Sequence, residues 1–227
     1  MTETFTRLLP DVAAGFTAAD LAVAVPGEPP GDRPFLLVNM IATADGRAAI
    51  AGRTGPIANR ADYELFHALR TRVDAVMVGA ETVRVESYGP MEASAVLVTR
   101  GANVPAEVGL LQAPGNRVVV LTPSPDAELP PCPAQVSYLR SGIVDGVRRL
   151  RTELGMRSVL CEGGPHLLGA LLRARLVDEL HLVIAPKLAG GPDPLTIVTG
   201  AAFDPPLDLR LLTVHEAGGY LFLRYGA

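Results

Sequence analysis

The sequence predicts an α/β fold built on a mixed, mostly parallel central sheet. Short runs rich in valine, isoleucine and leucine recur along the chain, and they lack the alternation of apolar and polar residues that marks a half-exposed strand. Patterns typical of helices separate these runs, which predicts parallel strands joined by crossover helices. Near the end of the chain two further runs flank Gly218-Gly219 and predict an antiparallel hairpin.

Seven buried strands are expected before the hairpin. They span residues 35–42, 75–79, 95–99, 117–121, 136–139, 158–161 and 180–185. The strands of the hairpin are expected at residues 209–215 and 220–225. Open α/β sheets bind ligands beyond the carboxyl ends of their strands, so the residues that follow these runs are the first candidates for a site.

Three helices are expected between the strands. Asn59 can cap the first, with Asp62 in its first turn. The second keeps apolar residues at a 4-3-4 spacing over residues 143–154. The third opens at Gly164-Pro165, because proline suits the first position of a helix.

The N-terminal part of the chain looks separate from the rest. A short helix is expected near residues 17–23, and residues 26–34 form a turn-rich linker with several prolines and glycines. We therefore expect an N-terminal extension and linker over residues 1–34 and one domain over residues 35–227.

The composition restricts the function. The chain has 227 residues, of which 48% are apolar and 19% charged, so it can bury a sizeable core. A net charge of −4 disfavours a protein that binds nucleic acid or anionic membranes. No stretch approaches the ~18 consecutive apolar residues of a membrane span, and the N-terminus lacks the features of a signal peptide. Neither the two cysteines nor the four histidines have the spacing of metal ligands. We expect a cytoplasmic protein that binds no metal and acts on a small molecule.

The strongest local signal is the segment from Ser158 to Leu168, where a buried strand runs into Gly163-Gly164 and then a helix. The glycines let a ligand approach the backbone, and the N–H groups of the helix start suit a phosphate or pyrophosphate. An ordinary tight turn explains the same residues equally well. Glu162 favours a site, because a carboxylate at the end of a buried strand is costly without a partner.

Two other strand ends carry residues suited to phosphate. Gly79 ends one strand, and Thr82 follows at the start of a turn or short helix, where N–H groups and a hydroxyl are available. Thr99 and Arg100 end the next strand, and the planar guanidinium of Arg100 suits the 2′-phosphate of NADP. Taken alone, Arg100 fits a solvated surface residue as well.

Polar residues elsewhere give weaker signals. Asn39 lies in a run that should be buried, so it needs a partner in the core or in a ligand. Asp45-Gly46 is a turn signal, and a structural role for it is as well supported as a binding role. Asp178 and Glu179 are expected to be solvated where a helix exits into a strand.

Four blocks of residues carry a resemblance to a known family. They are Ala42-Thr-Ala-Asp-Gly-Arg47; Leu69-Arg70 with Asp74-Ala-Val-Met-Val-Gly79 and Thr82; Cys161-Glu-Gly-Gly-Pro165; and Leu176-Val-Asp-Glu-Leu180 with Ile184-Ala-Pro-Lys-Leu188-Ala-Gly. In this order they resemble the pyrimidine reductase domain of riboflavin biosynthesis, from about residue 33 to the C-terminus. The resemblance implies a three-layer α/β/α, dihydrofolate-reductase-like fold and a homodimer. An apolar sheet edge over residues 182–188 is consistent with a dimer.

The resemblance also implies a reaction and a site. The family reduces the ribosylamino group of a pyrimidine 5′-phosphate to a ribitylamino group with hydride from NADPH. The resemblance implies that the cofactor contacts residues at the ends of several strands, and Gly79 is included because it ends one of them. The expected cofactor contacts are Ala42, Gly79, Thr82, Glu86, Thr99, Arg100, Gly163, Gly164, Pro165, His166, Leu167 and Leu168. The substrate is expected near Thr54, Arg70 and Glu162, with Asn39, Asp45 and Tyr88 as further candidates. Glu162 is the candidate catalytic residue, as a substrate anchor and proton source.

One segment departs from the family's pattern. After Thr82 the family continues toward a phosphate-binding arginine, and Ala93 stands where that arginine is expected. A dihydrofolate- or pteridine-type NADPH reductase, with Tyr88 in a pocket that accepts an aromatic ring, is therefore a second hypothesis. A non-catalytic, dimeric NADP-binding protein is a third. The motifs of the zinc deaminase that often precedes this reductase are missing, so a stand-alone reductase or a relative of one is expected.

Overall fold

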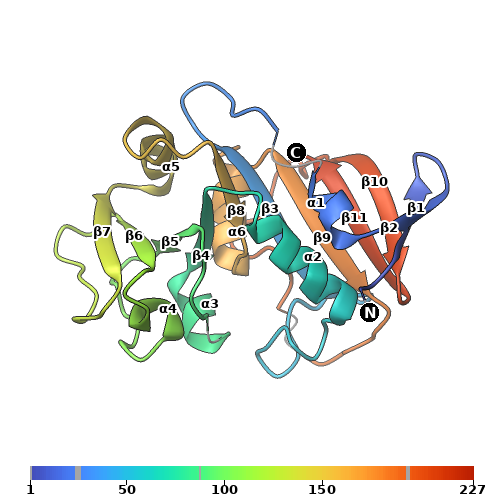
Figure 1. Cartoon of the computed structure of the whole chain (residues 1–227), viewed down its shortest axis with the longest axis horizontal. Coiled ribbons are helices and arrows are strands. Elements are labelled where there is room, and N and C mark those ends of the chain that lie inside the picture. The colour runs from blue at the N-terminus through green and yellow to red at the C-terminus, as the bar shows by residue number, and fades with distance from the viewer. Residues whose placement is uncertain (1, 24–26, 87, 193–194) are drawn as a thin grey trace.

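One mixed sheet runs through the whole molecule in the computed structural model, which describes residues 2–23, 27–86, 88–192 and 195–227. Its strands are β1 (Phe5–Leu9), β2 (Ala13–Phe16), β3 (Phe35–Thr43), β4 (Ala75–Gly79), β5 (Ser94–Val98), β6 (Arg117–Thr122), β7 (Gln135–Arg140), β8 (Ser158–Cys161), β9 (Glu179–Ala185), β10 (Arg210–Ala217) and β11 (Tyr220–Gly226). They lie in the order β2-β1-β10-β11-β9-β3-β8-β4-β5-β6-β7 (Figure 1). The predicted strands and the closing hairpin are confirmed, with bounds that shift by one or two residues.

The parallel half of the sheet forms the centre of the core. β3 pairs in parallel with β8 and β9, and β4, β5, β6 and β7 continue the parallel order beyond β8. All nine residues of β3 are buried. Its side chains alternate between the two faces of the sheet, and both faces are covered, which explains the missing alternation in the sequence.

Helices cover both faces of this sheet. α2 (Arg60–Arg70) packs its buried residues Leu65 and Leu69 on one face, and the Asn59 side chain accepts the N–H of Asp62 as predicted for a cap. α5 (Ile143–Thr152) and α6 (Pro165–Arg173) contribute to the apolar core of the opposite face. Three shorter helices are α1 (Ala18–Val23), α3 (Ala80–Val85) and α4 (Gly109–Gln112). No helix among the described residues is long and apolar enough to cross a membrane.

The N-terminal segment packs on the same sheet. β1 pairs with β10, and β2 extends the sheet beyond it. Phe5 is fully buried and lies edge-on against Phe222, with 4.9 Å between the ring centroids. The short helix expected near residues 17–23 is α1, whereas Pro26 of the expected linker lies outside the described residues. The division of the chain at residue 34 into two parts stays a prediction, but β1 and β2 share one sheet with the rest.

Two expectations about β9 and its neighbouring residues are wrong. Asp178 and Glu179 are not solvated: Arg33 binds both carboxylate oxygens of Asp178 at 2.6 and 2.8 Å, and Arg224 binds both oxygens of Glu179 at 2.7 Å. Residues 182–185 form no sheet edge, because β9 is hydrogen-bonded to β3 on one side and to β11 on the other; Leu188, beyond the end of β9, is 82% exposed. Sequence alone does not place the distant arginines or the partner strands.

The packing of Phe5 gives a test of the N-terminal segment. Phe5→Ala should lower the free energy of unfolding by about 3–5 kcal/mol, because the side chain is fully buried and its loss leaves a cavity. Val12→Ala, at a residue 77% exposed, is the matched control and should change it by less than about 0.5 kcal/mol. Urea unfolding measures both. Equal, small changes would mean that β1 is not part of the cooperative fold.

Candidate active site

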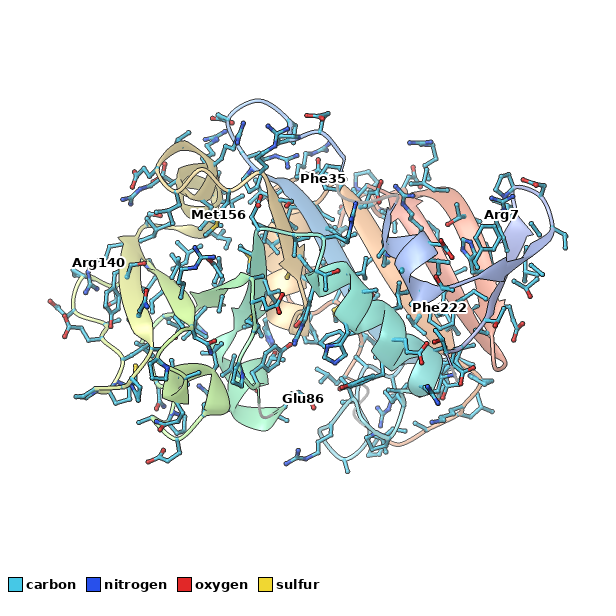
Figure 2. The ribbon with its side chains drawn as sticks, viewed as in Figure 1. Arg7, Phe35, Glu86, Arg140, Met156 and Phe222 are labelled. Atoms are coloured by element: carbon cyan, nitrogen blue, oxygen red, sulfur yellow. The ribbon has the colours of Figure 1, made fainter. Side chains whose placement is uncertain are left out.

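The candidate site lies where the parallel strands end. In Figure 2, Phe35 at the start of β3 lies at the top of the molecule and Glu86 lies at the bottom, on the side of the carboxyl ends. The register pairs Cys161 at the end of β8 with Val38 of β3 and Met77 of β4. Glu162 therefore leaves the sheet at its centre, and its N–H continues the ladder to the carbonyl of Met77 at 3.0 Å.

A buried ion pair forms the centre of the site. Arg70, at the end of α2, binds Glu162 through both carboxylate oxygens, with Nε–Oε1 and Nη2–Oε2 distances of 2.7 Å. The hydroxyl of Tyr88 donates to Oε2 of Glu162 at 2.9 Å. The Glu162 side chain is 2% exposed and that of Arg70 is 17% exposed. Three segments far apart in sequence thus meet at one carboxylate, which gives this buried charge the partners it needs.

The environment changes the titration of these groups. Burial raises the pKa of Glu162, and the bonds from Arg70 and Tyr88 oppose that rise only in part. Burial raises the pKa of the Tyr88 hydroxyl well above its usual value, and the charge of the nearby Glu162 carboxylate raises it further. Tyr88 therefore keeps its proton at neutral pH and can act as the donor to Glu162.

An aromatic residue that the sequence analysis missed completes this cluster. The ring of Phe66 lies under the guanidinium of Arg70, 4.1 Å from Cζ to the ring centroid, and Tyr88 lies on Arg70 at 5.3 Å. Such stacking holds the plane of the guanidinium in a fixed direction. The available signal was the spacing, because Phe66 is four residues before Arg70 on the same helix.

The two glycines after Glu162 pack closely on the neighbouring strand end. The N–H of Gly79 donates to the carbonyl of Gly163 at 2.9 Å, and Gly163 has a φ of +95° that favours glycine. A Cβ on Gly164 would come within 2.9 Å of the Thr82 hydroxyl. The start of α6 and the start of α3 thus adjoin, which brings two of the predicted phosphate-suited strand ends together.

Two predicted site residues bind each other. The Glu86 carboxylate accepts the N–H of Thr54 at 2.8 Å and its hydroxyl at 3.1 Å. Glu86 is the C-cap of α3, and Thr54 begins a turn that precedes α2, in which its carbonyl accepts the N–H groups of Ile57 and Ala58. This bridge and the Arg70–Glu162 ion pair link the two ends of α2 to the opposite side of the site.

The turn after β3 has a structural role. The Asp45 carboxylate accepts hydrogen bonds from the Thr43 hydroxyl and from the N–H groups of Ala189 and Gly190. Together these bonds lower the pKa of Asp45 to about 2, and the bond from Thr43 has the largest effect. These bonds tie the end of β3 to the loop after β9. Asn39 differs, because its Oδ1 atom is buried without a hydrogen-bond partner among the described residues.

The remaining predicted cofactor residues are spread over the same edge of the sheet. Ala42 is buried near the end of β3. Thr99 accepts the N–H of Ala102, while Arg100 and His166 are exposed. The side chains of Leu167 and Leu168 are part of the core, and the N–H of Leu168 is bonded to Gly164 within α6. Because these leucine side chains are packed in the core, only the backbone of the first turn of α6 is available to a ligand at the site.

Ala93 lies away from the site. It directly precedes β5, whose first residue Ser94 pairs with Ala75, the first residue of β4. Ala93 is thus at the amino ends of the strands, and a five-residue strand is roughly 16 Å long. Counting residues from Thr82 therefore does not identify a side chain of the site here.

Comparisons with known proteins identify sequences similar to this chain. Residues 34–222 match the model of the RibD C-terminal domain family. A 2,5-diamino-6-ribosylamino-4(3H)-pyrimidinone 5′-phosphate reductase of Methanothermobacter thermautotrophicus is 30% identical over 217 residues, which cover 85% of this chain and 98% of that protein. A protein of the same name from Aquifex aeolicus is 27% identical over 192 residues, 76% of this chain and 85% of its own length.

Solved structures share the fold. A pyrimidine reductase-like protein of Corynebacterium diphtheriae has a TM-score of 0.70 and 22% identity, over 85% of this chain and 91% of that one. A deaminase/5-amino-6-(5-phosphoribosylamino)uracil reductase of Thermotoga maritima has a TM-score of 0.71 and 23% identity, over 86% of this chain and 56% of that one. The fold class predicted from the sequence is confirmed.

The contact of Gly164 with α3 can be tested. Gly164→Ala should lower the free energy of unfolding by about 1–3 kcal/mol, because the new Cβ would meet the Thr82 hydroxyl at 2.9 Å. Gly142→Ala is the matched control: Gly142 also caps a helix, and a Cβ there meets no atom within 4 Å. Thermal unfolding of both variants checks this, and equal effects would contradict the close approach of the two segments.

Proposed function

The chain belongs to the RibD C-terminal domain family, and from this premise we propose that it is an NADPH-dependent pyrimidine reductase of the riboflavin pathway. The proposed reaction converts the ribosylamino side chain of a pyrimidine 5′-phosphate to a ribitylamino side chain. The observation that carries the proposal is the buried Glu162, fixed by Arg70 and Tyr88 next to a glycine turn at the carboxyl ends of the parallel strands.

The residues present fit a dinucleotide. A Cβ would fill the approach between Gly164 and Thr82, and the first turn of α6 offers backbone N–H groups beside it. Arg100 is exposed at the end of β5, where its guanidinium can bind the 2′-phosphate that separates NADPH from NADH. When bound, NADPH supplies the hydride, and the protein supplies position and electrostatics.

Glu162 would hold the substrate and provide a proton. A carboxylate has about four acceptor positions, and three donors from Arg70 and Tyr88 occupy positions on Glu162, so one position remains for a substrate hydroxyl or amine. Its raised pKa brings protonation closer to neutral pH, which suits a group that exchanges a proton with substrate. The stacked Phe66 and Tyr88 keep Arg70 from turning away.

One experiment distinguishes the proposed reaction from two other functions, a pteridine-type reductase and a non-catalytic NADP-binding protein. The purified protein would be assayed for NADPH oxidation with the pyrimidine ribosylamino phosphate and with dihydrofolate, and NADPH binding would be measured by calorimetry. Turnover of the pyrimidine supports the proposal. Turnover of dihydrofolate alone would support a pteridine-type reductase, and NADPH binding without either turnover a non-catalytic protein. Absence of NADPH binding would contradict all three. A homodimer and a cytoplasmic location stay predictions.

Arg100→Ala should discriminate between the two nicotinamide cofactors. We expect the Kd of NADPH to rise about 10- to 100-fold, because a charge-assisted phosphate contact is lost, and the Kd of NADH to stay unchanged. Arg117→Ala is the control, since Arg117 is an exposed arginine at the amino end of β6, on the other side of the sheet from the strand ends that form the site. Equal losses for both cofactors would remove the assigned role of Arg100.

Glu162→Gln should lower kcat about 100-fold with little change in the Kd of NADPH. The amide keeps the shape of the side chain but cannot exchange a proton, and it leaves Arg70 without a negative partner. Steady-state kinetics and calorimetry measure the two effects. Glu153→Gln, at an exposed carboxylate that also binds an arginine, should leave both unchanged. An unaltered rate in Glu162→Gln would exclude Glu162 from the chemistry.

A further inference from the structure

A second cavity lies between the N-terminal segment and the sheet. It has a volume of about 160 Å³, and its lining comes from β1, β2 and α1 on one side and from β9, β10 and β11 on the other. Leu65 of α2 also lines it, whereas Phe66 and Arg70 of the same helix belong to the buried cluster of the candidate site. In Figure 2, Arg7 and Phe222 of this lining lie on the right of the molecule. Helix α2 therefore separates the cavity from the candidate site.

Part of the cavity is formed by residues outside the match to the family. Arg7, Phe16, Asp20 and Leu21 line it, and all four precede residue 34, where the match begins. The segment reaches the sheet because β1 pairs with β10, which places Arg7 opposite His215. The cavity thus depends on the N-terminal segment of this chain.

The sheet side of the cavity carries polar groups without partners. His181 is 6% exposed, and its Nε2 atom forms no hydrogen bond with the described residues. The Glu179 carboxylate lies 3.6 Å from this atom, and both of its oxygens already bind Arg224. The Thr213 hydroxyl and the His215 imidazole also line the cavity and form no hydrogen bond within the described part of the chain. Buried polar groups of this kind need a water or a ligand as partner.

The Arg7 guanidinium gives the cavity a positive charge. Its Nε and Nη2 atoms bind Asp11, but Nη1 forms no hydrogen bond with any described residue. Phe16 lies under the guanidinium, 5.1 Å from Cζ to the ring centroid, which holds its plane in place. Burial lowers the pKa of His215, and the charge of Arg7 lowers it further. The positive potential that disfavours a protonated His215 favours a bound anion.

The other charged groups of the lining already bind protein groups. The Asp20 carboxylate accepts the N–H and the hydroxyl of Thr17 at 2.8 and 2.7 Å. Arg224 binds both oxygens of Glu179 at 2.7 Å. Among the described residues of the lining, Arg7 is therefore the cation that can offer N–H groups to an anion in the cavity.

The walls around these polar groups are apolar. They are formed by Phe16, Leu21, Leu65, Val183 and Phe222. A cavity of roughly 150 Å³ holds one benzene ring, so there is room here for a single ring. A phosphate dianion would lose much of its hydration against such walls. A carboxylate carries one charge, and its planar pair of oxygens matches the edge of a guanidinium.

We propose that this cavity binds an aromatic carboxylate of single-ring size. The ring lies against the apolar walls, and the carboxylate accepts hydrogen bonds from the Arg7 guanidinium, the Thr213 hydroxyl and an imidazole N–H. This is a second binding site, and its occupation does not depend on the proposed reaction.

The four histidines of the chain allow the site to be located directly. Benzoate is the probe, and proton NMR follows the imidazole resonances, assigned with single histidine-to-glutamine variants. We expect the resonances of His181 and His215 to move during a millimolar titration, because both line the cavity. Those of His67 and His166, which are exposed and lie outside the lining, should stay in place. Movement of His166 alone would place benzoate at the start of α6 and overturn the proposal, as would a titration that moves no resonance.

A neutral isostere tests the role of the charge. By calorimetry, benzoate should bind at least about 10-fold more tightly than benzamide, which has the same ring without the negative charge. Arg7→Met should abolish this preference. Arg149→Met is the matched control, because Arg149 also pairs with a carboxylate four residues later but lies on α5, outside the cavity. Equal affinities for benzoate and benzamide in the wild type, or a preference that survives in Arg7→Met, would overturn the proposal.

Thr213→Val separates loss of the ligand contact from loss of the fold. Valine keeps the volume of the side chain and removes only the hydroxyl, so Tm should change little and the Kd of benzoate should rise about 3- to 10-fold. Acetate replaces benzoate in the reference titration, which keeps the ionic strength constant. An unchanged Kd in Thr213→Val together with an unchanged Kd in Arg7→Met would show that the carboxylate does not bind at this cavity.

Discussion

The ion pair of Arg70 with Glu162 is the interaction on which the rest of the site depends. A carboxylate that is 2% exposed at the end of a central strand is stable only with a well-placed partner, because desolvation of its charge is costly. Arg70 meets it with two bonds of 2.7 Å and is itself held between Phe66 and Tyr88. The pair thereby fixes the end of α2 against the end of β8, and the loop after α3 joins through the Tyr88 hydroxyl.

Small residues set how closely these segments approach. Gly79 and Gly163 are joined by a backbone hydrogen bond, and a Cβ on Gly164 would lie 2.9 Å from the Thr82 hydroxyl. The starts of α3 and α6 therefore lie close together, and each offers backbone N–H groups. The buried pair and the glycine junction are adjacent in sequence, which places a rigid anchor next to a surface suited to phosphate.

Most other charged residues near the strand ends serve the fold. Asp45 ties two loops together, Glu86 holds Thr54, and Asp178 pairs with Arg33. Asp62 is different, because its partly buried carboxylate has no bond to the described residues.

The sequence by itself determined the parallel strands and the cap at Asn59, and it predicted a site at the carboxyl ends. These features depend on local patterns, in which a buried apolar run or a capping side chain acts within a few residues. It did not place Phe66, and it treated Asp178 as solvated and Ala93 as part of the site. Only the tertiary structure decided which distant groups meet, because the direction of a side chain and the pairing of β1 with β10 depend on contacts between residues far apart in the chain.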